Sequence, residues 1–313
     1  MVVIMIKYIL LFNFLLSSSY ADESTFVSYE EAPAEADKCT RVKTDGVDPH
    51  LNTLALDALD ISDNVRRGKS CTFYDDFIAE GVPVPALKQA LKYFENNKND
   101  FSNKNYITIA DYSQNSSIKR FFLLDLRTGG VVKEKVSHGS GSLKGVKYAD
   151  ATIKNGRVTK ASSHNGNLKR CRIPKEKVAN KHDQWALTRP GFFKTRNFYM
   201  SSSHDERVKG QRGWPSFKVD GRTFNGMRLE GLTRGVNDKA LSQGVVMHEA
   251  YYNRGSVMGR SFGCPAFVPS KGRELMKKIV NGSLYYSYVP VAGCSEDHRK
   301  VLKTVSGWET MCN

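Results

Sequence analysis

The sequence lacks a long apolar segment beyond its first residues. After residue 21, no stretch reaches the ~18 apolar residues that a transmembrane helix needs, so the mature protein is expected to be soluble. The chain has no CxxC pair and no His/Cys cluster with zinc-site spacing, so we expect neither a metal nor a cofactor. It has no internal repeat, and its composition is that of a globular protein.

Residues 1–21 have the pattern of a secretory signal peptide. Lys7 is the only charge, residues 8–16 form a short apolar run, and small residues precede a cleavage site after Ala21. The alternative is an uncleaved membrane anchor, for which the run is short. We therefore expect export to the periplasm or cell envelope, or secretion, with no integral membrane span after the signal is removed.

The chain is strongly basic, with 47 Lys and Arg against 32 Asp and Glu and a formal net charge of +15. The basic residues are spread along the whole sequence. A cationic protein favours anionic partners. For an exported protein, an anionic cell-wall polymer or a membrane surface fits better than nucleic acid. A basic surface without a function is the alternative.

Six cysteines are present, and export permits disulfides. They are Cys39, Cys71, Cys171, Cys264, Cys294 and Cys312. If Cys264 is a free thiol, two pairings between sequence neighbours are natural: Cys39 with Cys71, and Cys294 with Cys312. Cys171 is then left over, although spacing does not determine connectivity.

The apolar pattern predicts a mainly β (α+β) protein with few helices. Residues 22–104 are expected to contain an acidic, flexible lead-in and then a small helical region, because residues 85–94 have an apolar stripe at helical spacing. Strand patterns cover residues 106–111, 120–126, 131–136, 191–195, 226–232, 244–248 and 284–289. A further helix is expected over residues 270–281, with Gly282 as its cap.

Residues 143–184 interrupt this pattern. They are rich in Lys, Asn and Ser and have little periodicity, which indicates a long surface insertion. We expect one domain over residues 105–292 that carries this insertion, followed by a C-terminal tail over residues 293–313.

The most informative stretch is residues 259–266, in which Cys264 follows His248 by sixteen residues. A thiol nucleophile needs a neighbour that takes its proton, and an imidazole does this near neutral pH. Gly263 lets the backbone approach a substrate carbonyl, and N–H groups around Cys264 are candidates for an oxyanion hole. One Cys and one His alone prove little, because a Cys in an apolar setting is usually a core residue or half of a disulfide.

This stretch resembles the signature of the L,D-transpeptidase (YkuD-type) catalytic domain, a His followed after a spacer by Ser/Thr-x-Gly-Cys. The wider sequence resembles the murein L,D-transpeptidase subgroup with Gly-Cys-Pro-Ala. Matching segments occur in order at residues 109–113, 116–120, 124–126, 136–139, 191–195, 227–232, 236–240, 246–248 and 259–266.

The resemblance implies a YkuD-like β-sandwich or barrel with flanking helices, acting on peptidoglycan stem peptides. Cys264 would attack the carbonyl between the third residue and D-alanine, and D-alanine would leave. An amine acceptor then gives a 3–3 cross-link, whereas water gives L,D-carboxypeptidase activity. His248 is the matching base, and Ser261 and Gly263 are signature positions beside the nucleophile.

Two positions depart from the commoner family pattern. Phe262 stands where a His precedes the Gly-Cys, and Ala266 stands where an Arg follows the Cys. The Gly-Cys-Pro-Ala subgroup also has Ala at the position of Ala266, so the assignment of Cys264 as nucleophile and His248 as base is kept. Arg260 is a candidate for the missing Arg, whose usual role is to bind a substrate carboxylate; an exposed structural Arg is the alternative.

Other residues have both a site role and a plainer interpretation. His138 is a candidate for the cleft or a loop residue, and Tyr251 and Tyr252 are candidates for a cleft wall or for core packing. Glu249 is a poor candidate to orient the imidazole, because adjacent strand residues point to opposite faces. A backbone carbonyl is expected to do so. Residues in polar stretches are expected to be solvated or in loops: His164, His182, His204 and Ser201, Ser202 and Ser203.

A catalytically silent cell-wall-binding protein is the competing hypothesis from another class. The basic charge and the insertion favour it, whereas the intact pair of Cys264 and His248 argues against it. A generic exported cysteine peptidase would need a different motif around the nucleophile, and none is present.

Overall fold

The structure is a computed structural model of the chain. It describes residues 69–142, 152–154, 157–160, 165–172, 187–254, 256, 258 and 261–313. The predicted signal peptide and lead-in lie outside the described residues, as do Cys39, Arg260, His164, His182 and most of the insertion.

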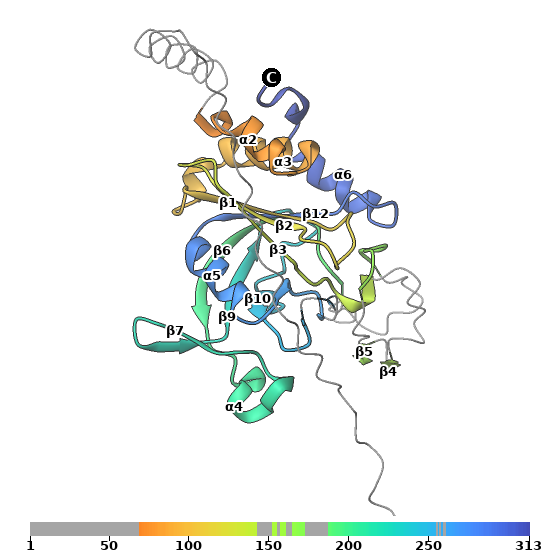
Figure 1. Cartoon of the computed structure of the whole chain (residues 1–313). Helices are drawn as coiled ribbons and strands as arrows, with labels where there is room; N and C mark the ends of the chain where they lie inside the picture. Colours follow the sequence, from red (N-terminus) through yellow and green to blue (C-terminus); the bar gives the residue numbers. More distant parts are fainter. Residues whose placement is uncertain are drawn as a thin grey trace, which may run out of the picture. The chain divides into compact units, whose positions relative to one another are not determined.

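An eight-stranded sheet is the centre of the molecule, which is mainly β with a few helices (Figure 1). In spatial order its strands are β11 (Ala266–Phe267), β10 (Val246–Glu249), β9 (Gly226–Gly231), β6 (Gly191–Tyr199), β12 (Leu284–Tyr288), β1 (Tyr106–Asp111), β2 (Phe121–Asp125) and β3 (Val131–Glu134). Neighbours are antiparallel except β1 with β12 and β10 with β11. Two hairpins stand apart: β4 (Thr152–Lys154) with β5 (Arg157–Lys160), and β7 (Phe217–Val219) with β8 (Arg222–Phe224).

The helices are α2 (Tyr74–Ala79), α3 (Val84–Asn96), α4 (Glu206–Lys209), α5 (Lys271–Ile279) and α6 (Ser295–Lys303). Short 3-10 turns are η1 (Lys69–Cys71), η2 (Lys98–Asp100), η3 (Ser140–Ser142), η5 (Ser202–His204), η6 (Gly210–Arg212) and η7 (Trp308–Thr310).

The segment that follows β3 joins the two ends of the sheet. The Ser137 N–H donates to the carbonyl of Ala266 in β11 at 2.9 Å, and the Ser261 N–H donates to the His138 carbonyl at 3.3 Å. A β-bridge also pairs Gly139 with Ser261. These bonds satisfy edge groups that would otherwise be unpaired, and the sheet becomes nearly closed, like a barrel.

A buried arginine holds this closing segment in place. The Nε and Nη2 groups of Arg120 donate to the Val136 carbonyl at 3.1 and 2.9 Å, and Nη1 donates to the Gln114 carbonyl at 2.7 Å. Its guanidinium also packs over the Tyr112 ring and contacts the His138 ring nitrogen. Burial lowers the pKa of Arg120 to about 10, so the group stays charged at neutral pH.

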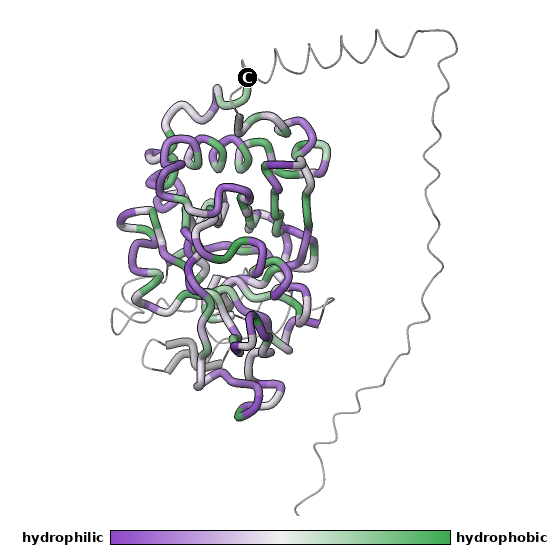
Figure 2. Tube along the Cα trace, turned by 90° about the vertical axis from the view of Figure 1, so that its left-hand side faces the viewer, coloured by the Kyte–Doolittle hydropathy of each residue, from purple (hydrophilic) through white to green (hydrophobic). Residues whose placement is uncertain are grey.

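Helix α3 covers one face of the sheet, and α2 lies beside it (Figure 1). It begins with a Pro in its first turn, and its apolar stripe is buried, as the helical spacing predicts. Figure 2 shows apolar and polar residues alternating along this helix near the top of the molecule. Tyr93 stacks on Phe192 with ring centroids 3.9 Å apart, and Phe192 stacks on Tyr286 at 4.3 Å.

Strand residues alternate between this layer and a second core. In β12, Tyr286 faces α3, whereas Tyr285 belongs to the other core together with Leu275 and Met276 of α5. Phe121 meets Phe267 edge-on there, at 4.9 Å. The second core therefore lies beneath β9, β10 and β11, the strands that support the candidate site.

The predicted elements are largely confirmed. Each predicted strand pattern in residues 106–289 corresponds to a strand of the main sheet, and β2 and β3 form the predicted hairpin. The C-terminal helix of the domain ends at Ile279, earlier than predicted, and Asn281 and Gly282 both have positive φ. Gly282 is required because a Cβ would lie 2.1 Å from the Ser102 hydroxyl. Residues 293–313, expected to be a tail, form α6 and η7.

The predicted disulfide pairings are wrong. Cys71 pairs with Cys312, and Cys171 pairs with Cys294. The C-terminus returns beside α2 and α3 (Figure 1), so a distant cysteine, not a sequence neighbour, meets Cys71. Cys264 is a free thiol, as expected.

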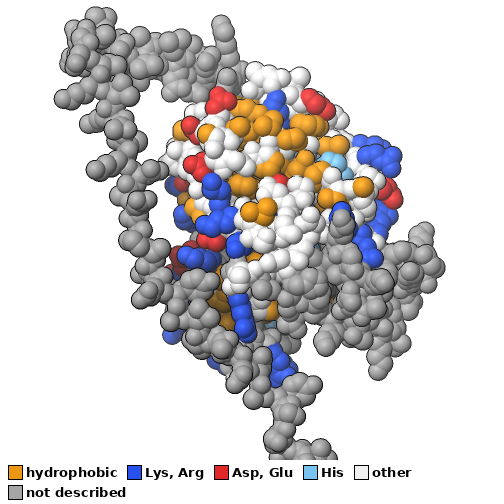
Figure 3. Space-filling view, turned by 45° about the vertical axis from the view of Figure 1, so that its right-hand side comes forward, with side chains coloured by type: hydrophobic (Ala, Val, Ile, Leu, Met, Phe, Trp, Pro, Cys, Tyr) orange, Lys and Arg blue, Asp and Glu red, His pale blue; other side chains and the backbone are white. Residues whose placement is uncertain are grey.

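Basic side chains are distributed over the surface of the molecule. On the face shown in Figure 3, Lys and Arg side chains lie in separate groups among uncharged ones, which agrees with their even spread along the sequence. None of the helices in the described residues is long and apolar enough to cross a membrane.

Peptide mapping without reduction tests the disulfide framework. We expect linked peptides containing Cys71–Cys312 and Cys171–Cys294, and alkylation of Cys264 in the folded protein. Replacing Cys71 and Cys312 together with Ser should lower the free energy of unfolding by about 2–5 kcal/mol, measured by chemical denaturation. A Cys294–Cys312 peptide would contradict the fold around the C-terminus.

Candidate active site

Backbone bonds on both sides hold the loop that carries Cys264. Ser261 is anchored to the closing segment, and Ala266 begins β11. Between them, Gly263 has φ 104°, a conformation that L side chains rarely adopt. Its N–H donates to the Ser261 hydroxyl at 3.2 Å. The N–H of Cys264 itself has no hydrogen-bond partner within the described residues, so it is the candidate donor of an oxyanion hole.

His248 lies on the strand next to the nucleophile. Strand β10 pairs with β11 so that His248 is opposite Ala266, and the His248 N–H donates to the Pro265 carbonyl at 3.3 Å. The ring nitrogen Nδ1 lies 2.8 Å from the Glu249 carbonyl. A carbonyl only accepts, so Nδ1 carries the proton and Nε2 is left to accept one. The expected orientation by a backbone carbonyl is confirmed.

The carboxylate of Glu249 is directed away from the imidazole, as expected from strand alternation. It is buried and forms an ion pair with Arg273 in the first turn of α5, at 2.6 Å, and also accepts the Arg273 N–H at 2.7 Å. This pair fixes α5 to the residue that follows His248. A Cβ at Gly272 would lie only 2.9 Å from Glu249, so the close packing needs glycine.

Cys264 and His248 line one cleft of about 460 Å³. The Cys264 thiol is half-buried, and its weak hydrogen bond goes to the Gly244 carbonyl at 3.9 Å. The lining residues come from five separate stretches of the chain: Arg189, His204, Arg212, Trp214, Gln243, Gly244, Val245, His248, Tyr252, Phe262 and Cys264. The cleft is large enough for a peptide segment.

Three aromatic rings form a stack at one side of the cleft. Trp214 lies on the His248 ring with centroids 3.8 Å apart and an interplanar angle of 15°. His204 lies on the other face of Trp214, at 4.1 Å and 11°. The prediction that His204 is merely solvated is therefore incomplete, because one face of its exposed ring is covered. Trp214 was not recognised from the sequence, since a single Trp in a polar stretch gives no periodic signal.

Local bonds position Trp214 over the imidazole. The backbone N–H of Trp214 donates to the His204 carbonyl at 2.6 Å. Asp205 caps the N-terminus of α4, because its carboxylate accepts the backbone N–H of Arg207. Gly213 is needed because a Cβ would lie 2.7 Å from the Glu206 backbone. Tyr251 also fixes this rim, since its hydroxyl donates to the Glu206 carboxylate.

Burial controls the protonation of both candidate groups. Desolvation lowers the pKa of His248 to about 3, although the bond to Glu249 opposes this. Desolvation raises the pKa of Cys264 to about 11, partly offset by a backbone hydrogen bond from Val246 and by the charge of Arg189. The resting pair is therefore a neutral thiol and a neutral imidazole at physiological pH. Proton transfer has to accompany the attack of sulfur on a substrate.

Of the residues suggested for the substrate site, some line the cleft and others are buried behind it. Phe262 lines the cleft and is 52% exposed, and Gly263 borders a small cavity beneath the nucleophile loop. Ser261 and His138 are buried and do not line the cleft, so they support the loop and the closing segment. Tyr252 lines the cleft in place of Tyr251.

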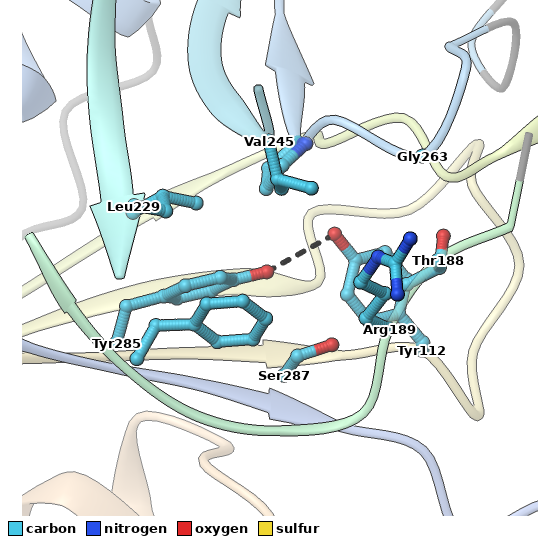
Figure 4. Close-up of a pocket in the computed structure, with 10 residues that line it drawn as sticks. Tyr112, Thr188, Arg189, Leu229, Val245, Gly263, Tyr285 and Ser287 are labelled. Atoms are coloured by element: carbon cyan, nitrogen blue, oxygen red, sulfur yellow. Dashed lines mark hydrogen bonds between the residues drawn. The ribbon is translucent and has the colours of Figure 1, made fainter. Parts of the chain in front are cut away.

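Arg189 was also missed by sequence reasoning, because it lies in an irregular segment with no motif. It borders both the cleft and the small cavity, where Tyr112 and Tyr285 share a hydroxyl hydrogen bond at 3.2 Å (Figure 4). Within the described residues, no group of three His, Cys, Asp or Glu side chains is arranged to hold a metal ion.

A free thiol and an oriented imidazole in one cleft are typical of enzymes that transfer acyl groups through cysteine. The sequence model of the L,D-transpeptidase catalytic domain matches residues 79–168 and 218–288, about half of the chain. No match was found among curated proteins or among solved structures. The chain belongs to the L,D-transpeptidase catalytic domain family, which supports L,D-transpeptidase-type activity on peptidoglycan.

The alkylation of Cys264 should depend on pH as expected for a thiol whose pKa is raised by desolvation. The thiolate is the reactive form, so the rate with iodoacetamide should rise through the alkaline range with an apparent pKa near 11. The His248→Ala variant should keep an alkaline profile, because an imidazole with a pKa of about 3 provides no cation near neutral pH. A reactive plateau over about pH 5 to 8 would instead indicate a thiolate–imidazolium pair.

Removal of the Trp214 ring should change the titration of His248. The Trp214→Ala variant exposes one face of the imidazole, and the pKa of His248 should rise toward its ordinary value because desolvation is relieved. The Trp214→Phe variant keeps a stacked ring and should shift less. NMR titration of the His248 ring carbons measures both, with Trp308→Ala as a control outside the cleft; equal His248 pKa values in all four proteins would contradict the role of the stack.

Proposed function

We propose that this protein is an exported murein L,D-transpeptidase with Cys264 as nucleophile and His248 as general base. The observation that carries the proposal is the shared cleft, which is lined by the free thiol and by an imidazole whose Nδ1 is held by the Glu249 carbonyl. Family membership supports the substrate class, a peptidoglycan stem peptide.

The acylation step follows from the neutral resting pair. As the Cys264 sulfur bonds to the carbonyl carbon of the third stem residue, its proton moves to Nε2 of His248. The Cys264 N–H stabilises the oxyanion. The C–N bond then breaks, His248 returns the proton to the departing amine, and D-alanine leaves a thioester on Cys264.

A second stem peptide completes the reaction. Its amine attacks the thioester carbonyl and transfers a proton to His248, and a new C–N bond replaces the S–C bond. The product is a 3–3 cross-link, and Cys264 regains its proton. If water enters instead, the product is a shortened stem peptide and the activity is that of an L,D-carboxypeptidase.

The two disulfides support the proposed export. Two disulfides in the described residues persist in an oxidising compartment such as the periplasm or the cell exterior. The net charge of +15 favours association with an anionic envelope polymer over long distances. Both observations support a place in the cell envelope.

Muropeptide mass spectrometry tests this proposal. Incubation of the mature protein with murein tetrapeptides should release D-alanine and yield 3–3 dimers. Because the thiol forms the covalent intermediate, Cys264→Ala should lower D-alanine release at least about 10³-fold, and His248→Gln should also lower it strongly.

His298→Gln is a matched control, since that His packs against Tyr288 away from the cleft. Its rate should equal that of the wild type. D-alanine release that survives in Cys264→Ala would contradict the mechanism. Tripeptides without dimers would identify water as the acceptor.

A further inference from the structure

Among the described residues, the cleft is lined by cations and by no carboxylate. Among its lining residues, the formally charged side chains are Arg189 and Arg212, and none is Asp or Glu. The two histidines there have lowered pKa values because they are partly or fully desolvated. A lining of this kind favours a ligand that carries negative charge.

Arg189 is a half-buried cation without a partner. Its guanidinium makes no hydrogen bond or ion pair with any other described residue. Arg172 and Arg273, by contrast, each pair with a carboxylate. Because burial of an unpaired charge is unfavourable, a bound anion would offset a cost that the folded protein already bears.

The nearest acidic groups are engaged elsewhere. Asp238 and Asp297 raise the pKa of Arg189 only through space, after the larger lowering by desolvation. Asp297 is bound by Arg172, and Asp238 accepts the Gly235 N–H at 3.2 Å. Cys264 also acts on Arg189, which shows that the guanidinium lies within electrostatic range of the nucleophile.

Buried hydrogen bonds fix the backbone on both sides of Arg189. The Thr188 hydroxyl accepts the Gly139 N–H at 2.8 Å, and the Thr188 N–H donates to the Ser142 hydroxyl at 3.0 Å. On the other side, the Asn237 side chain donates to the Pro190 carbonyl at 3.0 Å. Arg189 thus extends from a firmly held loop segment and borders the small cavity that Gly263 also lines (Figure 4). It also lines the cleft that contains Cys264.

We propose that Arg189 binds the terminal carboxylate of the D-alanine that leaves the stem peptide. This inference rests on the proposed function and specifies its substrate. In that peptide, the D-alanine carboxylate is separated from the scissile nitrogen by a single carbon, so a cation beside the nucleophile meets it first. A planar guanidinium suits a carboxylate because it can donate two parallel hydrogen bonds.

Two features distinguish Arg189 from the residues of the common family pattern. Ala266 stands where the commoner pattern has an Arg, and Arg189 lies in the stretch between the two segments that match the family. Binding of a terminal carboxylate selects peptides that end at the fourth residue. A peptide that is longer or carries a terminal amide lacks the anion at this position.

Matched substrates test the assignment. The wild type should cleave a tetrapeptide with a free terminal carboxylate at least about tenfold faster, in kcat/KM, than the same tetrapeptide with a terminal carboxamide. Arg189→Met should remove this preference by slowing only the free acid, and Arg189→Lys should retain part of it. Arg234→Met, which removes an exposed charge outside the cleft, should match the wild type. Equal losses on both substrates in Arg189→Met, or no preference in the wild type, would overturn the proposal.

A second measurement does not depend on peptidoglycan activity. Iodoacetate and iodoacetamide have nearly the same shape, and both lose iodide as the Cys264 sulfur bonds to their CH₂ group. Peptide mass mapping of Cys264 gives both rates of alkylation. The rate with iodoacetate divided by the rate with iodoacetamide should fall at least about threefold in Arg189→Met and stay unchanged in Arg234→Met.

The two measurements separate the possible failures. If the wild type releases no D-alanine from any tetrapeptide, the proposed function fails, whereas the alkylation ratio still decides whether Arg189 attracts a carboxylate to Cys264. An unchanged ratio in Arg189→Met overturns the anion site itself. Circular dichroism and thermal unfolding of each variant verify that the fold is retained.

Discussion

The closure of the sheet by residues 137–139 is the constraint on which the site depends. Hydrogen bonds from this segment hold Ser261 and Ala266, the residues on either side of the nucleophile loop. Arg120 holds the same segment through its bonds to Val136, and its charge is tolerated because carbonyls and an aromatic face surround it. A barrel that opened at this point would release the Ser261 end of the Cys264 loop and leave the Ala266 end held only by β10. The geometry of the thiol is therefore a consequence of the barrel as a whole.

Desolvation is the second theme of the site. The same burial that keeps the Cys264 thiol protonated also keeps the His248 imidazole neutral. Trp214 contributes by covering one face of the imidazole, and Arg189 opposes the effect by placing a positive charge near the sulfur. Both groups are consequently neutral at physiological pH, so an attack by the sulfur would require the imidazole to take its proton at the same time. Such a site holds no standing thiolate, which is the form of cysteine that is most readily oxidised.

Local patterns were sufficient for much of the fold. The β-rich composition of residues 106–111 and the buried apolar run at residues 284–289 predicted β1 and β12, and the apolar stripe of residues 85–94 predicted α3, because residue type and burial leave local patterns in the sequence. The disulfides were predicted incorrectly for the converse reason. Proximity in sequence says little about cysteines whose partners are brought together by the return of the C-terminus. Trp214 and Arg189 were missed because turns and rim loops have no periodicity.

The sequence by itself determined the chemical groups, the order of strands and helices along the chain, and the family. Cys264, His248 and the Gly-Cys-Pro-Ala stretch are local facts that need no coordinates. Tertiary structure alone decided that Trp214 covers the imidazole, that Arg189 shares the cleft with the thiol and has no ion pair with another described residue, and that Ser261 and His138 are buried supports. The physical reason is that burial and pairing depend on contacts between distant segments, which form only when the sheet closes.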